Sequence, residues 1–190
     1  MSQQAAAQER ARSYFQSKAA LPASAVREQI AAAFGALDAT LGTASPEHAA
    51  RRAIPGEWSV QEIVDHLLET YRPGVDELRC LLAGQRPPGE PIPAAVQSKA
   101  PLLRPWPWLL DELRRQRRDV LDLLGAVPAG FAGRAVAPIV MVVNVPGAGG
   151  AMQPIHWIEE VEWKAYAIAS WRLHAIDHMK QARKVLAACR

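Results

Sequence analysis

Two histidines near the C-terminus have the spacing of a metal-ligand pair. His174 and His178 lie four residues apart in a segment, 155–190, that contains neither Gly nor Pro. On an α-helix, residues i and i+4 share one face one turn apart, so two imidazoles can reach the same metal ion. A catalytic zinc site commonly has three protein ligands and leaves a position open for water or substrate. The pair therefore raises the question of a third ligand.

His66 is the candidate for that third ligand. It follows the run Ser59-Val60-Gln61-Glu62, which has the pattern of a capping box at the start of a helix. Ile63, Leu67 and Leu78 fall on the same side of this expected helix, so the imidazole should point toward the core. Because packed helices have axes about 8–10 Å apart, a ligand on this helix could complete a site with the pair on the last helix.

Other residues are weaker candidates. His156 would lie about 27 Å from the pair along a continuous helix, and His48 falls in an expected loop. Glu62 is one turn before His66, but the capping box is its simpler role. Asp177 could at best hydrogen-bond a ligand. The alternative to a metal site is a set of core histidines whose ring nitrogens bond carboxylates or backbone carbonyls.

The elements that would position these residues are amphipathic helices. Their number and spacing predict an all-α fold in the form of a four-helix bundle. A Pro-rich stretch, 85–105, predicts a long crossover between helices 2 and 3. Pro73-Gly74 should kink or split helix 2. Trp163, Tyr166 and Trp171 are expected to belong to the core. The four expected helices cover Ser24 to Leu41, Ser59 to Gly84, Trp106 to Leu124, and Pro154 or His156 to Ala187.

Two segments lie outside these helices. We expect residues 1–22 to form an N-terminal arm, which is either a helix packed on the bundle or a partly frayed tail. Residues 126–154 contain a β-branched run, but Pro138 and the Pro/Gly-rich stretch after it argue against a long central strand. We expect there an ordered loop that could contain a short β segment, lying over one end of the bundle. The rest of the chain, 23–190, is expected to form a single domain.

Composition narrows the class of protein. A chain of 190 residues with 49% hydrophobic and 22% charged residues is globular and long enough for one sizeable core. The net charge of +3 comes from basic residues interleaved with acidic ones, as in Arg115 and Asp119 at i,i+4, which argues against nucleic acid as a partner. Cys80 and Cys189 have no metal-ligand spacing, and we expect reduced thiols.

The sequence predicts no membrane partner. The N-terminal residues lack the apolar core of a signal peptide. No apolar run approaches the roughly 20 residues that span a bilayer. We therefore expect a cytoplasmic protein.

The motifs together resemble a known family. The pattern W-S-x-x-E-I-x-x-H-L over residues 58–67, followed by Glu159-Glu160, Trp163 and the H-x-x-x-H pair, resembles the DinB/YfiT-like superfamily. The resemblance covers roughly residues 24–187. It implies a four-helix bundle, a homodimer, and a divalent metal ion, zinc or nickel, held by His66, His174 and His178. Members of that superfamily include thiol S-transferases that use bacillithiol, mycothiol or glutathione, and also isomerases and hydrolases.

Two functional hypotheses follow. The first is a metal-dependent enzyme in which the three-His site activates a water or a low-molecular-weight thiol, for S-transfer to or hydrolysis of a small-molecule substrate. No other residue stands out in the sequence as a general base. The second is a non-catalytic metal-binding or stress-response bundle that acts through binding or protein association.

Overall fold

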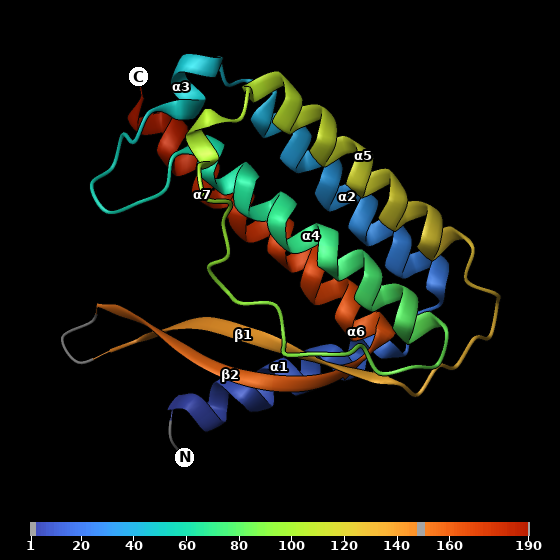
Figure 1. Ribbon diagram of the computed structural model, residues 1–190. Coiled ribbons are helices and arrows are strands. Elements are labelled where there is room, and N and C mark those ends of the chain that lie inside the picture. Colours follow the sequence, from blue (N-terminus) through green and yellow to red (C-terminus); the bar gives the residue numbers. More distant parts are fainter. Residues whose placement is uncertain (1–2, 148–150, 190) are drawn as a thin grey trace.

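The computed structural model describes residues 3–147 and 151–189, and most of these are helical. Four helical rods pack side by side, the last of them made of three consecutive segments (Figure 1). The expectation of a mostly helical protein is confirmed. The rods are α2 (Ala23–Leu41), α4 (Val60–Leu82), α5 (Trp106–Gly125), and the run of α6 (Trp163–Ala167), the π-helical η3 (Ile168–Leu173) and α7 (His174–Ala188).

Helix α4 is the central rod, and its start agrees with the sequence. The Ser59 side chain accepts a hydrogen bond from the Glu62 amide, while the Glu62 carboxylate accepts one from the Ser59 amide, which completes the predicted capping box. The helix has 23 residues in all and runs through Pro73 without a break, so it is not split. Gly74 and Leu78, which follow the proline, are buried. The apolar face of the helix therefore continues past Pro73, and its packing holds the second half of the helix in place.

The other rods bury the predicted apolar stripes. Val26, Ile30 and Leu37 of α2 are fully buried, as are Leu109 and Val120 of α5. Helix α2 begins at Ala23, one residue before the expected start at Ser24, and follows Pro22, whose side chain makes no cap. The connector after α2 contains a short helix, α3 (Pro46–Ala50), which includes His48.

A β-hairpin corrects the all-α prediction. Strands β1 (Val136–Pro146) and β2 (Met152–Glu162) pair antiparallel along their whole length, with Val136 opposite Glu162 and Pro146 opposite Met152. The last helix therefore starts at Trp163, not at Pro154 or His156, and the expected loop contains β1 and the start of β2. The prolines are tolerated because both strands of a two-stranded sheet are edge strands, where a missing N–H need not break a ladder.

The N-terminal arm adopts the helical alternative. Helix α1 (Gln3–Ala19) lies against the hairpin and α6, with Phe15 buried beneath it (Figure 1). Arg12 Nε is 3.1 Å from Glu159 Oε1 of β2, which fixes the arm to the hairpin.

The crossover between α4 and α5 is extended and passes between the helical rods and the hairpin (Figure 1). It contains a single short 3-10 turn, η1 (Pro101–Leu103). Cys80 and Cys189 are both free thiols, as expected. Among the described residues, no helix combines the length and the apolar character needed to cross a membrane.

Candidate metal centre

The structure brings the three predicted site residues together. His66 projects from α4 and His174 and His178 project from α7, and one ring nitrogen of each lies within 4.8 Å of the others. The ring centroids are 4.6–5.0 Å apart, and His66 is almost completely buried. The i,i+4 spacing on α7 and the inward face of α4 account for this convergence.

Each imidazole is anchored by an oxygen outside the cluster. His66 Nδ1 lies 2.7 Å from the Val96 carbonyl oxygen, and His178 Nδ1 lies 2.9 Å from Gln181 Oε1. His174 interacts with the Ser170 backbone carbonyl one turn earlier, and its Nε2 faces His66. A ring that donates through Nδ1–H carries a lone pair on Nε2, so the Nε2 atoms of His66 and His178 are available as ligands.

The Nε2 atoms of His66 and His174 face each other, 2.9 Å apart. Because the His66 Nδ1 hydrogen is committed to the Val96 carbonyl, His66 Nε2 accepts, either from His174 Nε2–H or from a cation between the rings. Nitrogens bound at 2.0–2.1 Å to a tetrahedral zinc ion are about 3.3 Å apart. Three converging imidazoles are thus a donor set that fits a divalent metal ion.

The electrostatics favour neutral, ligating imidazoles. Burial lowers the pKa of His66, partly offset by its bond to the Val96 carbonyl. Burial, with His178 and His66 as neighbours, holds the pKa of His174 well below its usual range. Burial lowers the pKa of His178 to about 4. At neutral pH the three rings are therefore uncharged, which is the form that binds metals.

The crossover is fixed at the site by Asp65, which precedes His66. The buried Asp65 carboxylate accepts hydrogen bonds from the Ser98 amide at 2.8 Å and the Ser98 hydroxyl at 2.7 Å, and it pairs with Arg104 at 3.0 Å. Ser98 is two residues beyond Val96, whose carbonyl holds His66. Asp65 therefore positions a ligand indirectly, through the crossover, and the sequence alone did not indicate this role.

Trp58 closes one side of the cluster. Its indole ring lies 5.0 Å from the His66 ring and stacks on His178 at 6.3 Å with an interplanar angle of 14°. Two of the weaker candidates lie outside the cluster itself. His156 is exposed on β2. Asp177 lines the same pocket as the histidines, but it is exposed and lies 3.7 Å from Lys180.

The histidines line a pocket of about 730 Å³ between the helices, the crossover and the hairpin. One wall is the β1 stretch from Pro138 to Asn144, and Ile92, Pro93 and Ala94 of the crossover form another. The lining is mostly apolar, as is usual for small-molecule sites. The hairpin missed in the sequence is thus a wall of the candidate site.

Glu77 and Tyr166 also line this pocket, and sequence analysis missed them as site residues. The Tyr166 hydroxyl donates a short hydrogen bond to Glu77 Oε2. Tyr166 is buried, as a core residue should be, but its hydroxyl reaches the pocket. Burial raises the pKa of Glu77, while the bond from Tyr166 lowers it by less. A lone Glu within a helix gives no spacing signal that could have singled it out.

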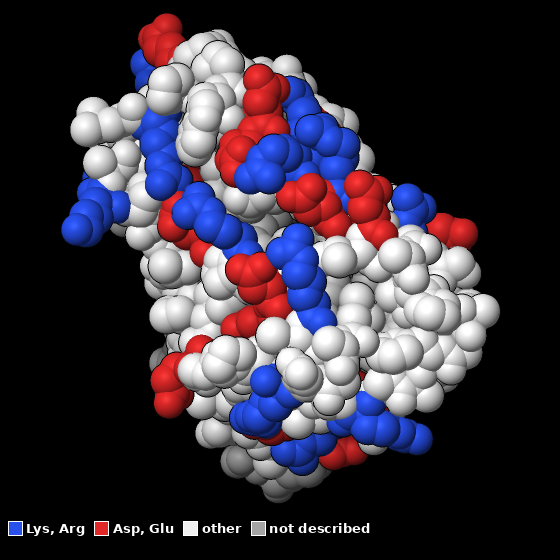
Figure 2. Space-filling model, turned by 45° about the vertical axis from the view of Figure 1, so that its right-hand side comes forward, with Lys and Arg blue, Asp and Glu red and all other residues white. Residues whose placement is uncertain are grey.

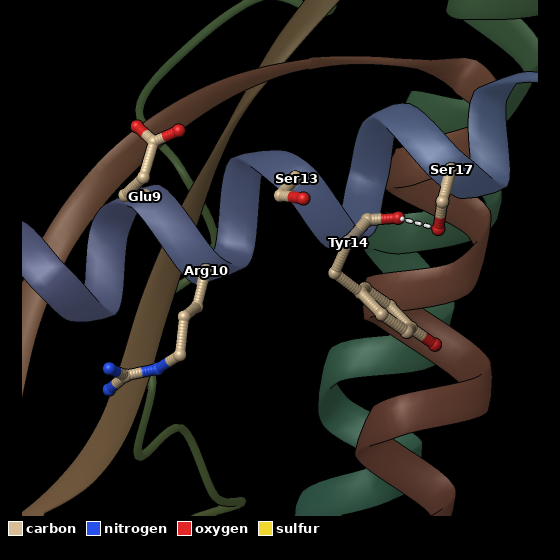
Figure 3. Close-up of a pocket in the computed structure, with 5 residues that line it drawn as sticks. All are labelled: Glu9, Arg10, Ser13, Tyr14 and Ser17. Atoms are coloured by element: carbon tan, nitrogen blue, oxygen red, sulfur yellow. Dashed lines mark hydrogen bonds between the residues drawn. The ribbon is translucent and has the colours of Figure 1, made fainter.

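A second hollow lies on the surface of α1. Figure 3 shows its five lining residues, all on that one helix, with the Ser17 hydroxyl donating to the Tyr14 carbonyl at 2.6 Å. Glu9 and Arg10 point away from each other in this view. Because no side chains converge there, the hollow does not compete with the three-His pocket.

The distribution of charge on the surface agrees with the expectation that the basic residues pair with acidic ones and face solvent. Figure 2 shows Lys and Arg interspersed with Asp and Glu over the visible face, without a broad area of one sign. Arg115, for example, contacts Glu112 at 2.5 Å and Asp119 at 3.2 Å. Such mixed faces do not provide the basic stripe that binds nucleic acid.

Comparison with known proteins identifies the family. The comparisons with curated proteins and with solved structures each gave no match. The family model of the DinB superfamily matches residues 29–182, which include the three histidines, Trp58 and the hairpin. Since the match covers most of the chain, the resemblance seen in the motifs is confirmed: the chain belongs to the DinB superfamily.

Proposed function

We propose that this protein is a divalent-metal-dependent enzyme in which His66, His174 and His178 hold zinc or nickel. The observation that supports the proposal is the convergence of the three rings in one pocket, with Nδ1 of His66 and of His178 each bound to an oxygen outside the cluster. A hydrogen bond that fixes the tautomer of the ring in this way is typical of metal-binding histidines.

The bound ion would lower the pKa of a water or a small thiol and supply hydroxide or thiolate near neutral pH. The residues of this chain form the surroundings of the ion. Trp58 and the apolar pocket walls exclude bulk water, and the crossover carbonyl of Val96 orients His66. Transfer of a low-molecular-weight thiol to an electrophile, or hydrolysis of a small molecule, is the chemistry that such a site supports.

An activity screen tests the proposal. The metal-free chain is loaded with zinc or nickel and assayed for transfer of small thiols to an electrophilic acceptor and for ester hydrolysis. We expect turnover only with metal, and a loss of at least about a hundredfold in His66→Ala. His156→Ala removes an exposed histidine outside the pocket and should leave the rate unchanged.

The result also separates the two functional hypotheses. Stoichiometric metal without turnover in any thiol or ester assay would favour the non-catalytic metal-binding bundle. Turnover that is unaffected by removing the metal or His66 would contradict the proposed mechanism.

A further inference from the structure

The pocket is elongated, and its two ends differ in chemistry. His66 and Glu77 both line it from α4, and eleven residues of helix correspond to about 16 Å. The β1 wall from Pro138 to Asn144 is seven residues long, or about 20 Å of strand. The three imidazoles therefore mark one end, and Glu77 with Tyr166 marks the other. Between them the lining is mainly apolar, including Ile92, Ile139, Met141, Ala169 and Leu173.

Glu77 differs from the other sheltered carboxylates of the described residues. It is half-buried, and no Lys or Arg forms an ion pair with it among residues 3–147 and 151–189. Lys180 lines the pocket too, but it lies on the histidine-bearing helix and pairs with Asp177. Every other buried or half-buried carboxylate in the same ranges has a basic partner: Asp38, Glu57, Glu62, Asp65, Glu69, Glu112, Asp119, Glu159 and Glu162.

The surroundings of Glu77 are shaped to orient this carboxylate. The Tyr166 hydroxyl occupies Oε2, which leaves Oε1 for another donor. Gly74, one turn earlier on α4, lies beside this pair, since a Cβ at that position would be in van der Waals contact with the Tyr166 hydroxyl at 3.4 Å and with Trp171 at 3.5 Å. A sheltered carboxylate held in one orientation without a cation is suited to receive one from a ligand.

We propose that Glu77 and Tyr166 form a recognition subsite for the ammonium group of an elongated, largely apolar substrate whose other end reaches the three histidines. The inference rests on the proposed function for the role of the histidine end. The ammonium group would pair with Oε1 of Glu77, and the apolar middle of the substrate would lie along β1 and the crossover. The subsite selects substrates and takes no part in bond making.

A thiol probe of matched length tests the subsite on the metal-loaded protein. In the cobalt-loaded chain, binding of a thiol is measured from the thiolate-to-cobalt absorption band. The probes are an amino-terminated and a hydroxyl-terminated alkanethiol of about eleven carbons, which span roughly 14 Å. We expect the amino-terminated probe to bind at least about tenfold more tightly, as a charge-assisted hydrogen bond would provide. Glu77→Gln should abolish this preference and leave the affinity of the hydroxyl-terminated probe unchanged.

Controls make the test specific. Glu90→Gln changes an exposed carboxylate of the crossover outside the pocket and should retain the preference. Tyr166→Phe keeps the ring and should weaken the preference only in part. Equal binding of both probes to the native chain, or a preference that survives in Glu77→Gln, would overturn the subsite.

A second measurement separates this subsite from the proposed function. Calorimetry with an alkylammonium ion of about ten carbons on the metal-free chain tests Glu77 without any thiol or metal. Binding that is lost in Glu77→Gln supports the subsite, and absence of binding to the native chain refutes it. If no thiol gives the cobalt band while the alkylammonium still binds, the thiol-activating function fails and the ammonium subsite stands.

Discussion

At the scale of residues, the candidate site depends on which nitrogen of each imidazole faces inward. The Val96 carbonyl and Gln181 Oε1 take the Nδ1 hydrogens of His66 and His178. The free Nε2 atoms are then a set of lone pairs in a buried place, which is costly without a cation. A metal ion relieves this cost, and protonation is opposed by burial.

The buried imidazoles predict how the metal-free protein responds to acid. The pKa of His178 is about 4 in the folded chain and 6.5 in the unfolded chain. Between these values the unfolded chain binds more protons, so the free energy of unfolding falls as the pH falls from 6.5 toward 4. Above pH 6.5 the group has no effect. For His178 alone the loss is on the order of 2–3 kcal/mol over this window.

Urea unfolding of the metal-free chain at pH 7 and pH 5 measures this effect. His178→Gln removes the titrating group and should show a smaller loss of stability between the two pH values. An unchanged loss in that variant would contradict the assignment of a buried, neutral His178.

At the scale of elements, α4 and the crossover form one positioning unit. The Gln61 amide donates to the carbonyls of Pro101 and Arg104, at 3.2 and 2.9 Å, and the Gln97 amide donates to the Glu62 carbonyl at 3.1 Å. With the bonds of Asp65, these contacts attach an otherwise extended segment to the first turns of α4. The crossover carbonyl that orients His66 is therefore held by the same helix that carries His66.

The variant Asp65→Asn tests this unit. It weakens the bonds to Ser98 and Arg104 and should loosen the Val96 carbonyl, so we expect metal affinity to fall about 10–100-fold. Competition with a chelator measures the affinity, and circular dichroism checks that the helices remain. Asp76→Asn, which changes an exposed carboxylate of the same helix, is the matched control. Equal affinities in the two variants would refute a positioning role for Asp65.

The same elements show what the sequence could and could not predict. Helix α4 was predictable because its capping box is local, and the convergence of His66 with α7 followed from helical spacing. Strand β2 was not predictable, because a segment without Gly or Pro from Ile155 onward favours a helix on local grounds. Its strand conformation depends on hydrogen bonds to β1, which the local sequence does not show. Glu77 could not be predicted as a site residue, because what distinguishes it is the lack of a basic partner. Whether a carboxylate has such a partner depends on the whole tertiary structure.

At the scale of the whole molecule, the hairpin turns a groove on the bundle into a pocket. Strand β1 faces the helices across the crossover, and α1 supports the hairpin from outside (Figure 1). The segment that departs most from the predicted all-α fold is thus the one that forms a wall of the three-His pocket. The homodimer implied by the family resemblance stays a prediction, and light scattering of the metal-loaded protein measures it directly.

Metal stoichiometry is the measurement that tests the central claim most directly. The untagged native chain, purified and exposed to zinc or nickel, is analysed by inductively coupled plasma mass spectrometry beside His66→Ala, His174→Ala and His156→Ala. We predict one ion per native chain and per His156→Ala chain, and far less than one in the other two variants. A native chain that binds no stoichiometric divalent ion under any loading condition, or variants that bind as much as the native chain, would contradict the three-His site.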